Sequence, residues 1–66
     1  MGTWYKVWTE DGQIYFVREI NDRFKVHDNS LVCLSHIDTV DSLVEALVLI
    51  VLNAESPIDE VKQWGG

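Results

Sequence analysis

The chain has 66 residues, of which 47% are hydrophobic, and its formal net charge at pH 7 is −6. A chain of this length forms one domain (residues 1–66) and buries only about 60% of its unfolded surface, so it needs help from a disulfide, a metal or a partner chain. Its single cysteine, Cys33, excludes an internal disulfide. The longest apolar run, 46–52, is far below the roughly 20 residues of a membrane span, so no membrane association is expected.

The acidic charge lies in the second half of the sequence. Acidic and basic side chains balance over residues 1–27, whereas residues 28–66 contain seven acids and one base, Lys62. This distribution disfavours direct binding of nucleic acid and would suit a basic protein partner. The N-terminus lacks the charged and apolar regions of a signal peptide, so a cytoplasmic location is expected.

The first third of the chain predicts a β-hairpin. Residues 3–9 and 14–20 are rich in alternating aromatic and β-branched side chains, and Asp11-Gly12 is typical of a two-residue type I′ turn. Such a turn would place Trp8 opposite Tyr15. The face expected to meet a helix then holds Tyr5, Val7, Ile14, Phe16 and Ile20. The other face holds Trp4, Trp8, Tyr15 and Val17, with Lys6 and Glu19 among them.

Two further strands are expected, at 24–27 and 31–35. A three-residue turn at 21–23 would put Phe24 and Val26 on the helix-facing side, and a two-residue turn would put them on the aromatic face. We favour the three-residue turn because it completes the core.

A long helix is expected over residues 38–53, with Asp38 or Thr39 as its N-cap. Apolar side chains at the i, i+3, i+4, i+7 spacing form a stripe predicted to face the sheet. The stripe consists of Val40, Leu43, Val44, Leu47, Val48 and Val51. The last turns are apolar on every side, so Leu49 and Leu52 need cover from the tail or from a second molecule.

The tail predicts a short helix from Pro57 to about Trp64, with Ser56 as N-cap. Ile58, Val61 and Trp64 recur every three residues, so this helix could cover Leu49 and Leu52 or the aromatic face. The predicted fold is therefore α+β: an antiparallel sheet of three or four strands, one long helix across one face, and a short C-terminal helix.

No motif predicts catalysis. The sequence has no nucleophile–base pair and no glycine-rich phosphate loop, so neither an enzyme nor a cofactor is expected. Cys33, His36 and Asp38 form a C-x-x-H-x-D pattern downstream of His27, but a zinc site needs four converging ligands. We interpret Cys33 as a small buried hydrophobe.

The terminal Gly65-Gly66 resembles the diglycine of ubiquitin-like and sulfur-carrier proteins, and the resemblance implies acyl-adenylate chemistry at Gly66. Those proteins reach the diglycine from a final strand, in the order ββαββ, whereas this sequence predicts a helix before it. A glycine after a helix is also an ordinary C-cap.

The sequence favours a non-enzymatic protein–protein interaction module that also forms a homodimer. An acidic inhibitor of the phage or mobile-element type, which mimics nucleic acid against a basic host protein, and a diglycine carrier remain alternatives. The aromatic face could be covered by the tail, contact a protein or stack unpaired bases, and the net charge counts against the last. The candidate partner-binding residues are Trp4, Trp8, Tyr15, Leu49, Leu52 and Trp64.

Overall fold

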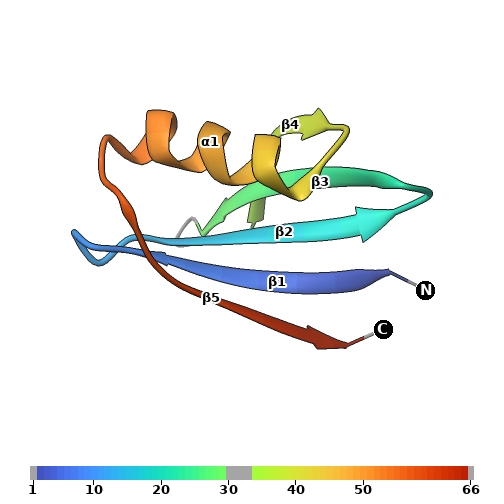
Figure 1. Ribbon diagram of the computed structural model, residues 1–66, viewed down its shortest axis with the longest axis horizontal. Helices are drawn as coiled ribbons and strands as arrows, with labels where there is room; N and C mark the ends of the chain where they lie inside the picture. The colour runs from blue at the N-terminus through green and yellow to red at the C-terminus, as the bar shows by residue number, and fades with distance from the viewer. Residues whose placement is uncertain (1, 30–33, 66) are drawn as a thin grey trace.

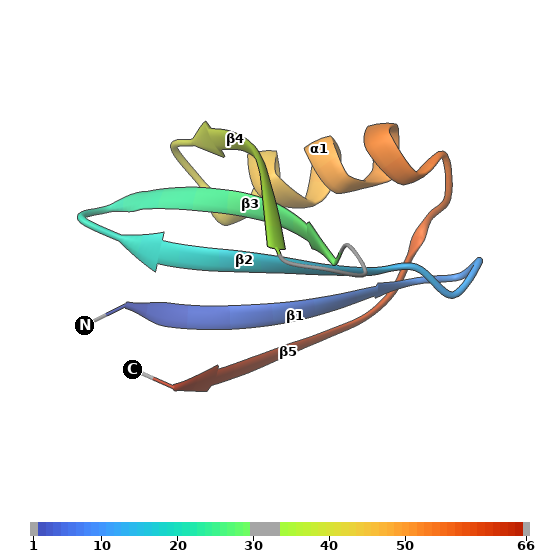
Figure 2. The ribbon, with the colours of Figure 1, turned by 180° about the vertical axis from the view of Figure 1, so that it is seen from behind.

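The computed structural model describes residues 2–29 and 34–65, and it shows a five-stranded antiparallel sheet with one helix across one face (Figure 1). The elements are β1 (Thr3–Thr9), β2 (Ile14–Ile20), β3 (Arg23–Asn29), β4 (Leu34–Val40), α1 (Leu43–Ala54) and β5 (Ile58–Gly65). The strand order is β4-β3-β2-β1-β5, so α1 returns the chain from one sheet edge to the other (Figure 2). The α+β class is confirmed, but the strand number, the helix bounds and the C-terminal helix were predicted incorrectly.

The first hairpin closes through a three-residue loop, Glu10-Asp11-Gly12, and the predicted two-residue loop is wrong. The amide of Thr9 donates to the carbonyl of Gln13 at 3.0 Å, and the amide of Gly12 donates to the carbonyl of Thr9 at 3.0 Å. Gly12 has φ 90°, in the left-handed region that glycine enters without steric cost. A type I turn followed by a left-handed glycine is a common three-residue hairpin loop.

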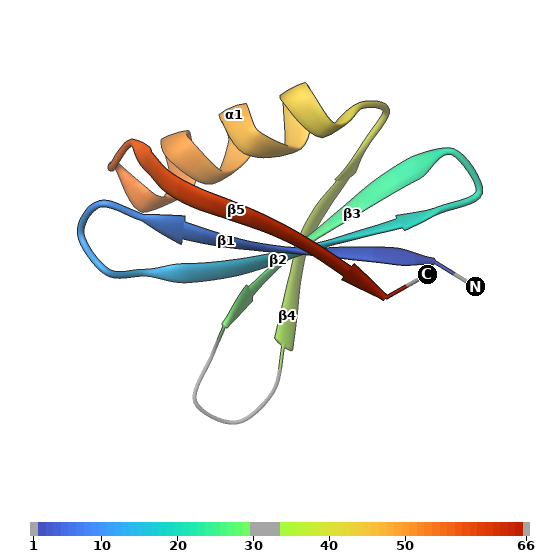
Figure 3. The same cartoon turned by 60° about the horizontal axis from the view of Figure 1, so that its bottom comes forward.

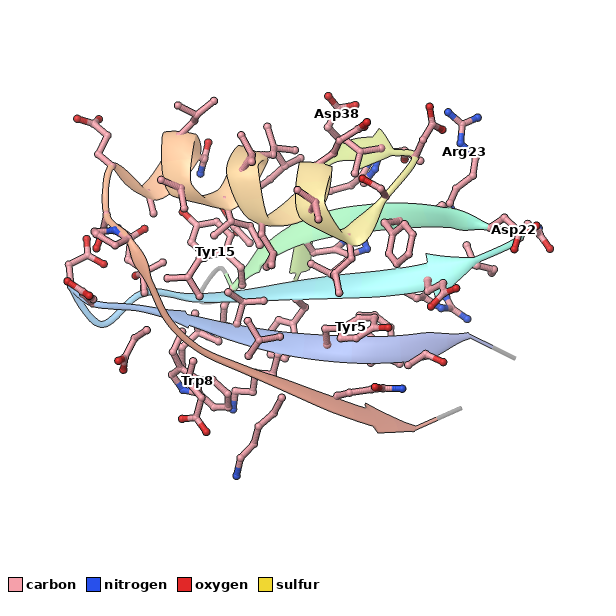
Figure 4. The ribbon with its side chains drawn as sticks, in the orientation of Figure 1. Tyr5, Trp8, Tyr15, Asp22, Arg23 and Asp38 are labelled. Atoms are coloured by element: carbon pink, nitrogen blue, oxygen red, sulfur yellow. The ribbon has the colours of Figure 1, made fainter. Side chains whose placement is uncertain are left out.

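This extra loop residue shifts the register of β2 by one and reverses its two faces. Val7 pairs with Tyr15, and Trp8 pairs with Ile14. The side chain of Tyr15 is therefore 2% exposed beneath the helix, although it was expected on the aromatic face. Figure 4 shows Tyr15 between sheet and helix, and Trp8 on the opposite side of the sheet. Phe16, predicted to face the helix, lies on the same side as Trp8.

The second hairpin closes through a two-residue loop, so the favoured three-residue turn is also wrong. Asn21 and Asp22 have φ 52° and 61°, as a type I′ turn requires, and both residue types tolerate this conformation. Phe24 and Val26 nevertheless face the helix as expected, and Val26 is fully buried. The first predicted loop is one residue too short and the second is one residue too long, so the predicted orientation of β3 is still correct.

The helix begins at Leu43, because β4 continues to Val40 and includes both predicted N-caps, Asp38 and Thr39. The N-cap is Ser42, whose hydroxyl accepts a hydrogen bond from the amide of Glu45 at 3.1 Å. Ser42 and Glu45 have the S-x-x-E spacing of a capping box, a signal that marks the helix start in the sequence.

The buried side of α1 matches the predicted stripe only in part, because Leu43 and Leu47 pack against the core but Val44 and Val48 do not. Ala46, Ile50 and Ala54 are its buried residues, whereas Val44 is 70% exposed and Val48 is 52% exposed. Two of these three helix residues are alanines, which allow α1 to approach the sheet closely, and Ile50 is the largest fully buried side chain. The buried core consists of Val7, Tyr15, Val17, Val26, Ala46, Ile50 and Ala54.

The tail is strand β5, paired with β1, and the predicted C-terminal helix is wrong. Ile58 pairs with Thr9 and Val61 pairs with Val7, with a bulge at Asp59. A bulge inserts one extra residue, so apolar side chains three positions apart lie on the same face of a strand. The predicted N-cap Ser56 instead accepts a hydrogen bond from the amide of Asp11 at 3.2 Å.

A strand also precedes the diglycine, so the predicted helical tail no longer separates this chain from the ubiquitin-like and sulfur-carrier proteins. The described elements nevertheless follow the order ββββαβ, with β5 antiparallel to β1. This order differs from the ββαββ order of those carriers. The resemblance therefore stays at the terminal glycines.

We expect Ile50→Ala to lower the free energy of unfolding by about 2–5 kcal/mol, because it removes a fully buried side chain. Leu52→Ala, at a 70% exposed position, should change it by less than about 0.5 kcal/mol. Urea unfolding of dilute, monomeric samples compares the two variants. Equal losses would contradict the observed orientation of α1.

Candidate functional site

The outer side of α1 presents an apolar surface, which we call the helix stripe. Its members recur at the i, i+3, i+4, i+7, i+8 spacing and line a shallow groove of ≈ 270 Å³. They are Val44, Leu47, Val48, Val51 and Leu52. Val44 and Leu52 are each 70% exposed, which places large aliphatic side chains in solvent along the whole helix.

The helix stripe has little charge around it. Glu45 is the one charged residue within α1, and the next is Glu55, immediately after the helix ends. The groove continues past this end to Pro57 and Ile58. An apolar surface of this kind is typical of a protein contact, because it offers no polar group to orient a small ligand.

The second surface is the face of the sheet opposite α1, which we call the open face (Figure 3). Strand pairing aligns Lys62, Lys6, Phe16, His27 and His36 in one row across all five strands. The neighbouring rows add Trp4 with Arg18 and Lys25, and Trp8 with Ile14.

Cations and rings alternate in space on the open face. The Lys6 ammonium lies 5.0 Å from the centroid of the Trp8 ring and 5.9 Å from that of Phe16. The Arg18 guanidinium lies 5.4 Å from the Trp4 ring centroid. Cation–π attraction at these distances holds the long basic side chains close to the sheet.

Carboxylates are scarce on the open face. Within residues 2–29 and 34–65, the ion pair found joins Arg23 to Asp41 at 3.2 Å. The other basic side chains of the protein, Lys6, Arg18, Lys25 and Lys62, have no carboxylate partner in that part of the chain. Glu60, which pairs with Trp8, is an acid at an open-face position of the described strands, and Asp59 is the adjacent bulge residue. Glu19, Asp28 and Asp38 occupy helix-side positions. The open face is thus locally cationic although the protein is acidic.

Two histidines extend the open face toward β4. The His27 and His36 rings lie 5.5 Å apart, and His36 Nε2 is 3.0 Å from the Thr39 hydroxyl. Burial lowers the pKa of His27, and the positive charges of His36, Lys25 and Arg18 lower it further. The described residues contain no group of three or more His, Cys, Asp or Glu side chains placed to hold a metal. Cys33 lies outside the described residues.

The predicted binding residues divide between the two surfaces and the core. Trp4 and Trp8 lie on the open face, half-buried, and Leu52 lies in the helix stripe. Leu49 is half-buried and packs against the core. The backbone of Trp64 pairs with Trp4, and its side chain lies outside the described part of the structure.

Tyr15 is a core residue rather than a surface contact. Its hydroxyl donates to Gln13 Oε1 at 3.0 Å and accepts from Asn53 Nδ2 at 3.0 Å, so it ties the first hairpin to the end of α1. Sequence reasoning placed Val44 and Val48 in the core and missed the open-face positions of Phe16 and Arg18. The capping box at Ser42 would have fixed the start of the helix, but the apolar pattern alone could not fix its rotation.

Comparisons with protein-family models, with curated proteins and with solved structures found no match. None of the helices in the described part of the chain is long and apolar enough to cross a membrane.

We expect the stability of the protein to fall as the pH drops through about 6.5, the ordinary pKa of histidine. Because the pKa of His27 is lower in the folded chain than in the unfolded chain, the unfolded state takes up the proton first. His27→Phe keeps a ring and removes the titrating group, so its stability should decline less between pH 7 and pH 5.5. Urea unfolding at several pH values measures the difference. Parallel pH profiles would contradict this role of His27.

Proposed function

We propose that the protein is a non-enzymatic protein-interaction module that binds a second copy of itself through the helix stripe. The observation that carries this proposal is the exposure of Val44, Val48 and Leu52 on one side of α1. Burial of such side chains is worth about 25 cal/mol for each Å² of apolar surface removed from water. In an isolated monomer these side chains stay exposed to water, whereas a dimer would bury them.

The size of the domain supports the same proposal. A 66-residue chain with one cysteine has few ways to supplement a small core. The core beneath α1 includes only three fully or nearly buried helix residues, Ala46, Ile50 and Ala54. A second copy packed on the outer side would bury α1 from both sides, and association of this kind often stabilises small domains.

The charge pattern permits self-association despite the net charge of −6. No charged residue lies between Glu45 and Glu55 on α1, so two stripes can meet without bringing carboxylates into the centre of the contact. Crossing of the two helices by ridges into grooves suits the stripe's spacing. The remaining charges stay at the rim, where water screens them.

We expect the wild-type protein to sediment at micromolar concentration with about twice its 7.6 kDa chain mass. Val48→Glu, which puts a carboxylate in the middle of the stripe at a 52% exposed position, should sediment as a monomer. Analytical ultracentrifugation over a tenfold concentration range measures both species.

Gln63→Glu is the matched control, because it adds the same charge at an exposed position of β5, outside the stripe. This variant should dimerise as the wild type does. A wild type that remains monomeric, or a Val48→Glu variant that still dimerises, would overturn the proposal.

A further inference from the structure

The open face carries a second, independent binding chemistry. Aromatic rings and cations without a carboxylate partner among the described residues lie together on it. Figure 4 shows Trp8 on the side of the sheet opposite the helix. We propose that the open face binds single-stranded nucleic acid, with bases stacked on the tryptophan rings and phosphates held by Lys6, Arg18, Lys25 and Lys62.

Charge complementarity supports an anionic occupant. Four of the five Lys and Arg side chains occupy the open face without a carboxylate partner among the described residues. Phosphate oxygens would accept hydrogen bonds from the ammonium and guanidinium groups and would neutralise the cations.

The aromatic side chains favour a nucleic acid over an acidic protein segment. Trp4 and Trp8 are half-buried on the same face of β1, with Lys6 between them, and each has a cation over its ring. Bases stack on aromatic rings with little sequence preference, while the backbone follows a basic groove. The carboxylates of an acidic peptide offer no aromatic bases to stack on these rings.

The net charge of −6 disfavours a nucleic acid, but acidic and basic side chains lie mostly on different sides of the molecule. The helix-side carboxylates include Asp41 and Glu45, beyond the sheet from the open face. The shortest dimension of the molecule is 19 Å, whereas the Debye length is about 8 Å at physiological ionic strength. The open face therefore presents its local positive charge to a bound strand with little opposition from the helix side.

The open face also suits a single strand better than a duplex. The bases of a single strand are free to stack on its rings, whereas the bases of a duplex are paired and stacked on one another. The expected specificity is consequently for unpaired strands and not for a particular base sequence.

The test is fluorescence anisotropy of a labelled 12-nucleotide oligodeoxythymidylate titrated with the full chain. If the four cations each meet one phosphate, the logarithm of the binding constant should fall against the logarithm of salt concentration with a slope of about −3. Trp8→Ala should weaken binding about 5- to 150-fold. Duplex DNA of the same length should bind more weakly than the single strand.

Matched variants distinguish the loss of a contact on the open face from a change in the net charge of the protein. Lys6→Gln should reduce affinity and flatten the salt slope by about one phosphate contact. Arg23→Gln removes the same charge from a side chain already paired with Asp41, and it should bind as the wild type does. Val48→Glu should also bind normally, so failure of dimerisation and failure of nucleic-acid binding are distinguishable. Circular dichroism checks that each variant is folded.

Three results would overturn the inference. The first is no binding of the oligonucleotide by folded wild-type protein at low salt. The second is equal loss in Lys6→Gln and Arg23→Gln, which would mean that net charge alone matters. The third is displacement of the oligonucleotide by polyglutamate of the same charge at equal concentration, which would identify an acidic protein segment as the better occupant.

Discussion

The register of the first hairpin is the constraint on which the rest of the structure depends. Gly12 closes a three-residue loop, and this loop places Tyr15 opposite Val7 rather than opposite Trp8. Because side chains alternate along a strand, the register decides which half of β2 is buried. Tyr15 and Val17 complete the core, and Phe16 and Arg18 join Trp4 and Lys6 on the open face. A shift of one residue would bury Phe16 and Arg18 and would dismantle both the core and the open face.

The second constraint is that the sheet covers only one side of α1. Ala46, Ile50 and Ala54 fit against the large side chains of the sheet, and this fit sets the rotation of α1. The outer side is then occupied by Val44, Val48 and Leu52, which have no cover within the described chain. The two proposed activities thus belong to opposite sides of one thin molecule: the helix stripe for a second copy, and the open face for a single strand.

The sequence predicted the α+β class, the first hairpin and the apolar helix, because alternation and helical periodicity are local signals. It could not predict the register of β2, since Asp-Gly occurs in both two- and three-residue loops. The sequence also could not predict the rotation of α1 about its axis. A helix that is apolar on both sides has no polar face to show which side points toward solvent. The bulge at Asp59 gave Ile58 and Val61 a helix-like spacing, so the tail was mistaken for a helix.

The candidate site was predicted only in part for the same reasons. Trp4 and Trp8 were placed correctly on the face away from the helix, since their strand kept its expected orientation. Tyr15 was misplaced by the register, and Phe16 and Arg18 were missed with it. The clustering of cations on the open face arises from strand pairing between residues as distant as Lys6 and Lys62, and net charge along the sequence cannot reveal it.

The most direct test of this account is a measurement of nuclear Overhauser effects between side chains of the first hairpin. The observed register predicts contacts between the rings of Trp4 and Phe16, whose centroids are 6.4 Å apart, and contacts from Tyr15 to the core side of α1. Contacts between the rings of Trp8 and Tyr15 would mean that the two-residue loop forms instead. That result would contradict the open face, the core and the proposals that rest on them.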